Sequence, residues 1–507
     1  MGDANGDSMH VVMLPWLAFG HILPFTEVAK RIARQGHRVT LLSTPRNTSR
    51  LIHIPPDLSN LIRVVDVSLP RVERLPEDAE ATIDLPSDDL RPYLRQAYDA
   101  AFASKLSEIL QAEPSRPDWV LIDYAPYWAP ALAAKHGVPC AFLSLFGGAA
   151  LGFMGSPETL MGQGKHARTR PEHLTAVPAY VPFPTTVAFR GYEAREIFNP
   201  GLVPDDYGVS ESYRFSKSIA ESRLVGVRSS DKFEPEWLRL VGELYKKPVI
   251  PLGLFPPSPT QDVAGHEATL QWLDKQAPGS VVYAAFGSEV KLKRAQLHTI
   301  ALGLEASGLP FLWAFRAPAD ADARNGEGAE ELPEGYEQRV NGRGLVCRGW
   351  VPQARLLAHE SMGGFLTHAG WNSITEGLAR GVRLVLLPLM FEQGLNARHL
   401  VEKKVAVEVD RDEEDGSFTA DGIAVALRRV MVDDSGEGFG TKAKELAKVF
   451  GNEEENDQLL RDFLRIDPYT AAVTSLLLVA LSPPTTAPPT SNPASLAAPC
   501  PPPSDEP

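Results

Sequence analysis

The side chains with the most evident chemistry lie in one segment, residues 350–393, which reads WVPQARLLAHESMGGFLTHAGWNSITEGLARGVRLVLLPLMFEQ. A Trp and a Gln open the segment, and a His ends an apolar run directly before Gly-Trp-Asn-Ser. A Glu follows within one helical turn, and an acid–amide pair closes the segment. Groups of these types in this order suit a ligand made of a flat base, a ribose, a diphosphate and a sugar.

The start of this segment could bind a nucleoside. Trp350 follows a short apolar strand predicted at 344–347, where an indole can stack on a flat base; a Trp of the protein core is the alternative. Gln353 adds hydrogen-bonding capacity nearby. Glu376 lies one turn into a predicted helix at 373–380, from which a carboxylate can accept hydrogen bonds from both ribose hydroxyls.

The middle of the segment could bind a diphosphate. His368 ends an apolar strand, and Gly370 lets the backbone approach a ligand closely. Ser373 opens the helix, whose N-terminus offers free N–H groups and a positive dipole end to phosphate. Side-chain donors of His368, Asn372 and Ser373 could add to these. A plain capping box, with Ser373 as N-cap and Glu376 three residues later, is the alternative for that pair.

The end of the segment could bind a sugar. Glu392 and Gln393 follow an apolar strand predicted at 384–387. A carboxylate beside an amide offers hydrogen-bond acceptors and donors together, which suits sugar hydroxyls. An ordinary polar loop is the alternative.

The elements that position these groups read as two α/β units. In the first, apolar strands alternate with helical spacing, which is typical of a parallel, doubly wound sheet. The second repeats the pattern after a Pro-rich stretch at 246–262. The predicted strands are 11–14, 37–43, 119–123, 140–145, 281–286, 311–315, 344–347, 364–366 and 384–387, and the clearest helices are 22–34 and 294–307. Two such sheets, facing each other across a cleft, would bind ligands at their carboxyl ends.

Composition excludes several classes of function. A chain of 507 residues is longer than one hydrophobic core usually supports, so we expect two domains. Its net charge of −14 argues against nucleic acid or an anionic membrane as its partner. Cys140, Cys347 and Cys500 form no CxxC or disulfide framework, and no clustered metal-ligand spacing occurs. The N-terminus lacks the basic start of a signal peptide, and the apolar run 471–481 is too short to span a bilayer. We therefore expect a cytoplasmic monomer that needs no metal or resident cofactor.

Segment 350–393 resembles the PSPG box of plant family-1 UDP-dependent glycosyltransferases, and the likeness extends from about residue 9 to residue 466. The matching positions are Trp350, Pro352, Gln353, His359, Gly363, Phe365, Thr367, His368, Gly370, Trp371, Asn372, Ser373, Glu376, Gly381, Val382 and Gln393. The resemblance implies a GT-B fold of two Rossmann-like domains. It divides the chain into a disordered start (1–8), an acceptor-binding domain (9–245), a linker (246–262), a UDP-sugar-binding domain (263–448), a helix that packs back on the first domain (449–466) and a disordered Pro-rich tail (467–507).

The resemblance also implies roles for matching residues. The uracil would stack on Trp350 and be held by the Val351 backbone and Gln353, while Glu376 would hold the ribose. His368, Asn372 and Ser373 would bind the diphosphate, with Ser288 near it, and Trp371, Glu392 and Gln393 would face the donor sugar.

Catalysis would depend on two residues outside the segment. Transfer to a hydroxyl needs a base, because an alcohol is a poor nucleophile at neutral pH, and histidine suits that task. His21 follows the first strand and matches the family's base. Asp123 ends the strand at 119–123 and matches the acid that orients it, although an ordinary strand-end Asp is the alternative. The implied reaction is a direct, inverting displacement with a UDP-sugar as co-substrate.

The acceptor and the donor sugar are less constrained. Trp128, Phe146 and Phe153 are candidate apolar walls of the acceptor pocket, and each could equally be core. The stretches PWLAFGHILPF and STPRN look most like members that extend sugars on flavonoid, terpenoid or saponin glycosides. Gln393 matches glucose-using members, whereas Glu392 replaces the usual Asp, so UDP-rhamnose, UDP-xylose or another donor stays open. A related epimerase or phosphorylase, or an inactive UDP-sugar-binding protein, is the competing interpretation.

Overall fold

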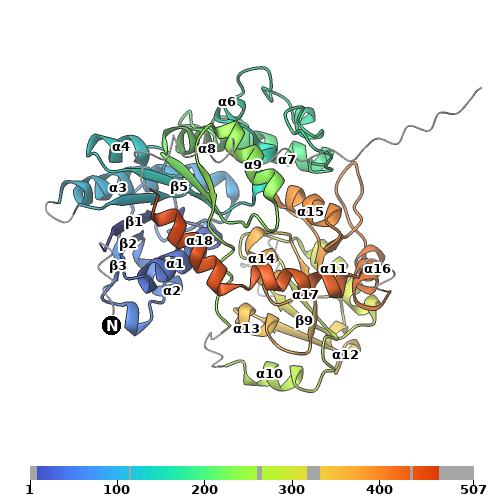
Figure 1. Ribbon diagram of the computed structural model, residues 1–507. Helices are drawn as coiled ribbons and strands as arrows, with labels where there is room; N and C mark the ends of the chain where they lie inside the picture. Colours follow the sequence, from blue (N-terminus) through green and yellow to red (C-terminus); the bar gives the residue numbers. More distant parts are fainter. Residues whose placement is uncertain (1–7, 113–115, 260–264, 317–331, 434–437, 467–507) are drawn as a thin grey trace, which may run out of the picture.

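The computed structural model describes residues 8–112, 116–259, 265–316, 332–433 and 438–466. They form two α/β domains, each built on one parallel sheet flanked by helices (Figure 1). The predicted fold class, two Rossmann-like doubly wound domains, is therefore confirmed. Apart from Ser8, the predictions of disorder for 1–8 and 467–507 fall on residues outside the described ranges.

The first sheet has seven strands in the order β3-β2-β1-β4-β5-β6-β7. They are β1 (His10–Leu14), β2 (Arg38–Ser43), β3 (Ile62–Asp66), β4 (Trp119–Ile122), β5 (Cys140–Ser144), β6 (Leu224–Val227) and β7 (Val249–Pro251). The central strands β1, β4 and β5 are nearly continuous apolar runs. Helices cover both faces of this parallel sheet, so the side chains that point to either face are buried.

The helices of the first domain connect these strands and form its outer layers. They are α1 (Phe19–Arg34), α2 (Pro45–Leu51), α3 (Arg91–Gln111), α4 (Ala129–Lys135), α5 (Gly148–Met154), α6 (Pro157–Leu160), α7 (Gly191–Leu202), α8 (Glu211–Glu221) and α9 (Pro235–Tyr245), with short 3-10 turns at Pro56–Leu58, Thr82–Asp84, Asp88–Leu90 and Pro171–Leu174. In α1, Phe25, Val28 and Ile32 are buried at helical spacing, and Arg31 and Arg34 occupy the last turn, where the helix dipole favours cations.

The second sheet has six strands in the order β10-β9-β8-β11-β12-β13. They are β8 (Val281–Ala285), β9 (Phe311–Phe315), β10 (Gly344–Arg348), β11 (Met362–Thr367), β12 (Arg383–Leu386) and β13 (Ala406–Glu408). The helices of the second domain are α10 (Glu267–Leu273), α11 (Arg294–Ser307), α12 (Tyr336–Arg339), α13 (Gln353–Leu357), α14 (Trp371–Ala379), α15 (Gln393–Glu402), α16 (Ala420–Arg428), a π-helical turn (Arg429–Asp433) and α17 (Phe439–Phe450).

One predicted boundary needs correction. The linker was placed at 246–262, but Val249–Pro251 pairs in parallel with β6 and is the last strand of the first sheet. A proline is tolerated there because the strand lies at the sheet edge, so a Pro-rich composition did not exclude a strand.

The last helix, α18 (Glu453–Leu464), packs on the first domain (Figure 1). Its Leu460 and Phe463 belong to the hydrophobic core beneath α1 and the first sheet. The guanidinium of Arg31, which is buried between α1 and α18, donates to the Asp457 carboxylate at 2.7 Å. The end of the described chain thus fastens the second domain to the first.

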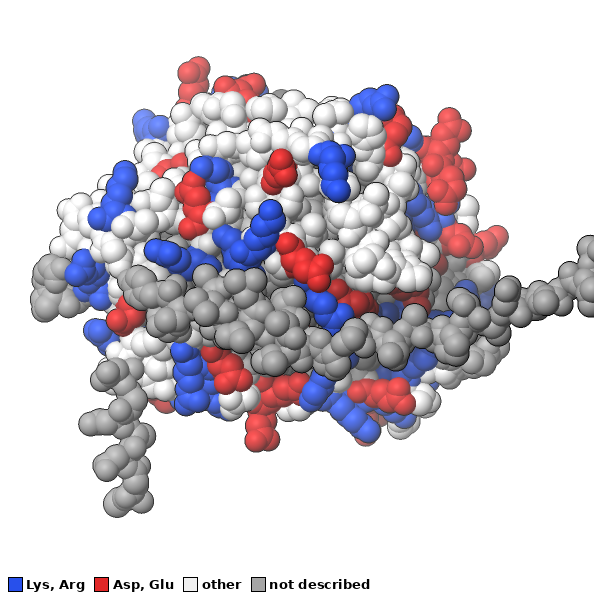
Figure 2. Space-filling view, turned by 45° about the horizontal axis from the view of Figure 1, so that its top comes forward, with Lys and Arg blue, Asp and Glu red and all other residues white. Residues whose placement is uncertain are grey.

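The face of the molecule in Figure 2 carries Lys and Arg side chains interspersed with Asp and Glu. Among the described residues of this face, basic side chains form no continuous stripe of the kind that nucleic acid requires.

Candidate active site

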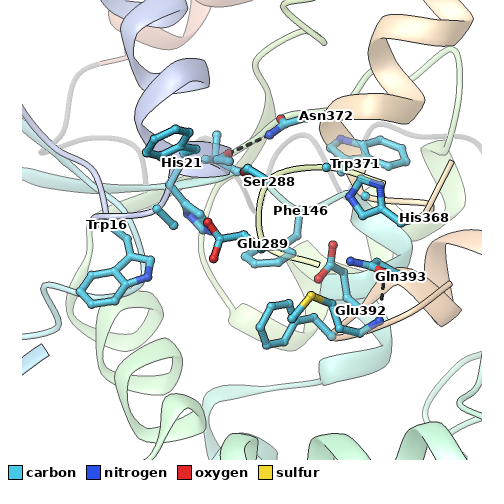
Figure 3. A pocket seen from close by; sticks show the side chains of 18 of the residues that line it. Trp16, His21, Phe146, Ser288, Glu289, His368, Trp371, Asn372, Glu392 and Gln393 are labelled. Atoms are coloured by element: carbon cyan, nitrogen blue, oxygen red, sulfur yellow. Dashed lines mark hydrogen bonds between the residues drawn. The ribbon is translucent and has the colours of Figure 1, made fainter. Parts of the chain in front are cut away.

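A cleft of about 1870 Å³ lies where the carboxyl ends of the two sheets face each other. His21 and Phe146 line it from the first domain, and His368, Trp371 and Glu392 line it from the second (Figure 3). Binding at this edge is the usual behaviour of doubly wound sheets.

His21 and Asp123 form a hydrogen-bonded pair in the cleft. The helix after β1 was predicted to begin at residue 22 but begins at Phe19, so His21 lies in its first turn. His21 Nδ1 is 2.6 Å from Asp123 Oδ2. The Asp123 carboxylate also accepts the backbone N–H groups of Trp16 at 3.0 Å and Tyr124 at 2.7 Å. The ionised carboxylate can only accept, so Nδ1 carries the proton and Nε2 is the free basic nitrogen.

The surroundings of His21 make its imidazole more basic. Burial by itself lowers the pKa of His21, but the attraction and hydrogen bond of Asp123, with the charges of Glu289 and Glu392, raise it above the usual 6.5. The free imidazole nitrogen is therefore a stronger proton acceptor than that of an isolated histidine.

The N-terminus of α14 points its free N–H groups at the cleft. This helix begins at Trp371 after the N-cap Gly370, which makes no side-chain cap. Ser373 is thus the third helical residue, and the capping-box alternative for Ser373 and Glu376 is wrong. The first-turn N–H groups that lack a partner inside the helix are available to an anion.

His368 lies close to two glycines, Gly287 in the loop after β8 and Gly370 at the start of α14. A Cβ at Gly287, whose φ is +75°, would lie 2.7 Å from His368 Nε2, and a Cβ at Gly370 would lie 2.5 Å from the same atom. Burial, with the charge of Arg316, lowers the pKa of His368 to about 4. A neutral imidazole keeps one N–H group, so His368 can still act as a hydrogen-bond donor.

Asn372 joins the two domains. Its side-chain nitrogen donates to the carbonyl of Gly20 in α1 at 2.8 Å, and its oxygen accepts from the Arg228 guanidinium. An amide nitrogen carries two N–H bonds, so one remains for a ligand. The indole N–H of Trp371 also crosses the interface and donates to the Arg228 carbonyl at 2.9 Å. The side chain of Trp371 can therefore offer a ligand in the cleft only the face and edge of its ring.

Arg228 is a buried guanidinium held by several neutral groups. Its Nε donates to the Leu254 carbonyl at 2.7 Å, and its Nη2 to the Phe255 carbonyl at 3.2 Å and to Thr375 Oγ1 at 3.0 Å. Burial lowers the pKa of Arg228 to about 10. Sequence reasoning missed this residue, because the strand before it, β6, was not predicted and a single Arg carries no distinctive signal.

The nucleoside end of the segment contains an ordered polar chain. Gln353 Nε2 donates to Glu376 Oε2 at 2.9 Å, and Tyr283 Oη donates to Gln353 Oε1 at 3.3 Å. Burial raises the pKa of Glu376. Trp350 is 65% exposed and lines the cleft beside Val351, so the core-Trp alternative is wrong.

At the sugar end, Gln393 and Glu392 begin α15. Gln393 Oε1 accepts the backbone N–H groups of Leu389 at 2.9 Å and Met390 at 3.0 Å, so only its NH₂ group is free to donate. Glu392 lines the cleft with 9% exposure, and its nearest donor, Asn396 Nδ2, is 3.4 Å away. Burial raises the pKa of Glu392.

Two of the three predicted acceptor walls line the cleft, and one does not. Phe146 and Phe153 lie on it, with the Phe146 ring centroid 6.1 Å from that of His21. Of the residues that the structure describes, those lining the cleft do not include Trp128. Its indole N–H instead donates to Asp99 at 2.8 Å, and its ring packs against the first-domain core. A Trp near a strand end was too weak a signal to tell these cases apart.

Sequence reasoning also missed Glu289 and Arg91. Glu289 directly follows Ser288 after β8 and lines the cleft beside His21 (Figure 3). The rule that strand carboxyl ends form the site could have found it. Arg91 begins α3 in the first domain and lies 3.5 Å from Glu289, which sequence spacing does not reveal.

Features of other functional classes are absent from the described part of the chain. It contains no group of three or more His, Cys, Asp or Glu side chains that could hold a metal ion. It also has no helix with the length and hydropathy needed to cross a membrane.

Known proteins show the same organisation. Residues 265–438 match the family model described as UDP-glucoronosyl and UDP-glucosyl transferase. UDP-glycosyltransferase 91C1 of Arabidopsis thaliana is 42% identical over 468 residues, which cover 92% of this chain and 98% of that protein. Soyasaponin III rhamnosyltransferase of Glycine max is 38% identical over 470 residues, covering 91% and 96%.

A solved structure agrees in fold. UGT2 of Phytolacca americana, complexed with UDP-2fluoro-glucose and pterostilbene, superposes with a TM-score of 0.68 at 25% identity, covering 90% of this chain and 99% of that one. The predicted GT-B arrangement is confirmed by this likeness. With relatives this similar along nearly their whole length, the chain belongs to the plant family-1 UDP-dependent glycosyltransferases, enzymes that use a UDP-sugar as co-substrate.

Proposed function

We propose that this enzyme transfers glucose from UDP-glucose, with inversion, to a sugar hydroxyl of a flavonoid, terpenoid or saponin glycoside. The observation that carries the proposal is the His21–Asp123 pair, which faces the Trp350–Gln393 segment across one cleft. A base and a nucleotide-sugar site on opposite walls are what direct transfer to a hydroxyl requires.

The donor would bind along the second domain. Uracil would stack on Trp350 beside Val351 and Gln353, and the ribose hydroxyls would bind Glu376. The diphosphate would lie at the start of α14, near Ser288, and accept hydrogen bonds from His368, Asn372 and Ser373. Trp371, Glu392 and Gln393 would surround the glucose.

The chemistry would proceed in one displacement. Nε2 of His21 takes the proton of the acceptor hydroxyl while Nδ1–H stays hydrogen-bonded to Asp123. The acceptor oxygen forms a bond to the anomeric carbon as the bond to UDP breaks, so the configuration inverts. The free N–H groups of α14 and the donors beside them stabilise the negative charge that develops on the departing diphosphate.

The choice of acceptor draws on the chain's relatives and on the cleft. A rhamnosyltransferase named for soyasaponin III, whose acceptor name denotes a saponin, is 38% identical to this chain. Phe146, Phe153 and Phe189 give the acceptor side an apolar wall that suits a large ring system. Glucose is proposed as the donor sugar because Gln393 matches glucose-using members of the family, and its free NH₂ group can donate to a sugar hydroxyl.

A crossed screen tests the proposal. UDP-glucose, UDP-rhamnose and UDP-xylose are each offered with phenolic and triterpene aglycones and with their monoglucosides, and products are identified by mass spectrometry. We expect the highest turnover with UDP-glucose and a monoglucoside. Preference for UDP-rhamnose would overturn the donor assignment. UDP binding without transfer to any acceptor would favour an inactive sugar-nucleotide-binding protein.

A further inference from the structure

The side chain of Glu289 is a carboxylate in the cleft that has no role in the displacement described above. It follows Ser288 in the loop after β8, and Figure 3 shows its side chain beside the His21 ring. The Glu289 side chain is 19% exposed. Glu289 therefore lines the cleft close enough to His21 for its charge to raise the pKa of that imidazole.

The hydrogen bonding of Glu289 is incomplete. Its Oε2 lies 3.5 Å from Arg91 Nη2, which is long for a charge-assisted hydrogen bond. Its Oε1 is buried and accepts no hydrogen bond from any described residue. Arg91 is occupied elsewhere, because its guanidinium also lies 3.2 Å from Asp88 and stacks 5.0 Å from the Phe391 ring centroid. The Glu289 carboxylate is therefore incompletely hydrogen-bonded, and its exposed part can accept a hydrogen bond from a hydroxyl of a ligand in the cleft.

Other tasks for Glu289 fit less well. It cannot orient His21, because Nδ1 of that ring is already bound to Asp123 at 2.6 Å. An ion pair with Arg91 would use one carboxylate oxygen and leave Oε1 aimed at no described donor. Glu392 lies farther along the donor segment, at the start of α15, where a donor sugar would sit.

We infer that Glu289 selects acceptors whose reacting hydroxyl belongs to a sugar. Its carboxylate accepts a hydrogen bond from the hydroxyl next to the one that His21 deprotonates. Sugars carry such neighbouring hydroxyls, whereas a lone phenol or alcohol offers only C–H groups there and leaves the carboxylate without this hydrogen bond. A site built to bind a hydroxyl discriminates strongly against ligands that lack it. This inference rests on the proposed function and identifies the residue that selects the proposed class of acceptor.

The test uses binding, so that it does not depend on turnover. Isothermal titration of the UDP-saturated enzyme compares a monoglucoside acceptor with its set of monodeoxy analogues. In the wild type, we expect the analogue lacking the hydroxyl next to the nucleophile to bind about 10-fold more weakly, which is worth about 1.4 kcal/mol. The Glu289→Ala variant should bind the parent glucoside about 10-fold more weakly than the wild type does. It should bind that deoxy analogue with the same affinity as the wild type does. Glu289→Gln, which keeps one acceptor oxygen, falls between.

Arg91→Met is the matched control, since it removes the ion-pair partner and leaves the carboxylate. If Glu289 merely joins the domains through Arg91, then Arg91→Met and Glu289→Ala weaken all analogues by one common factor, and the inference is overturned. The inference is also overturned if the ratio of affinities for the parent glucoside and the deoxy analogue is the same in the wild type and in Glu289→Ala. A wild type that shows the expected binding pattern but transfers no sugar contradicts the proposed function instead.

Discussion

The two walls of the cleft are built differently. The wall proposed for the donor comes largely from one stretch of the second domain, and several of its polar groups are held by fixed hydrogen bonds, as in the 2.9 Å bond from Gln353 to Glu376. The wall proposed for the acceptor gathers side chains from distant segments of the first domain, with aromatic rings such as Phe146 and Phe153 beside charged groups such as Arg91. A fixed ligand favours preorganised hydrogen bonds, while ligands of varied shape favour an apolar surface with few polar groups. The following substitutions test whether the two walls of the cleft act separately.

The largest effect should follow from His21→Ala. Loss of the base should lower kcat for transfer by about 10³-fold, because general-base catalysis typically contributes 10² to 10⁴. UDP affinity, measured by calorimetry, should change by less than about threefold, because the nucleoside and diphosphate groups lie on the other wall. His136→Ala, at the C-terminus of α4 outside the cleft, is the control. Full turnover without His21 would exclude it as the base.

Asp123→Asn should come next and should also shift the pH profile. Asp123 raises the pKa of His21 above 6.5, and only the neutral imidazole accepts a proton, so wild-type kcat/KM should fall as pH drops through that raised pKa. Removing the carboxylate charge lowers the pKa of His21, so the acid limb should move to lower pH while the plateau drops about 10²-fold. An acid limb that does not move would assign the titration to another group.

Arg228→Met should weaken the joint between the walls. It leaves the carbonyls of Leu254 and Phe255 and the oxygen of Asn372 without their donor. Stability against urea should fall by about 2 kcal/mol, the scale expected for buried acceptors left unpaired. Arg63→Met, on an exposed part of β3, is the matched control. An equal effect of both variants would show that Arg228 does not fasten the domains.

Glu392→Asp should have the smallest effect, and it sharpens the comparison. Shortening this side chain by one methylene should change the ratio of kcat/KM for UDP-glucose over UDP-xylose by about two- to fivefold, consistent with the modest cost of moving one contact at a sugar. The preference among acceptors should stay constant. A changed acceptor preference would mean that Glu392 serves both walls.

The side chains of the second-domain wall were largely predicted from the sequence because they lie in one contiguous segment. The acceptor wall was not, because it depends on which distant segments meet. Trp128 and Phe153 looked alike in sequence, yet only Phe153 lines the cleft. Ser373 and Glu376 have capping-box spacing, but the chain starts its helix two residues earlier, at Trp371, so the two residues form no capping box. Glu289 and Arg228 matter through partners far away in the chain, which no local pattern records.

The central claim is direct displacement by an acceptor that His21 activates across the cleft from the donor. The anomeric configuration of the product tests it most directly. Proton NMR of the glycoside formed from UDP-α-glucose should show a β-linkage from the first turnover onward. An α-linked product would contradict a single displacement, and free glucose as the only product would contradict transfer.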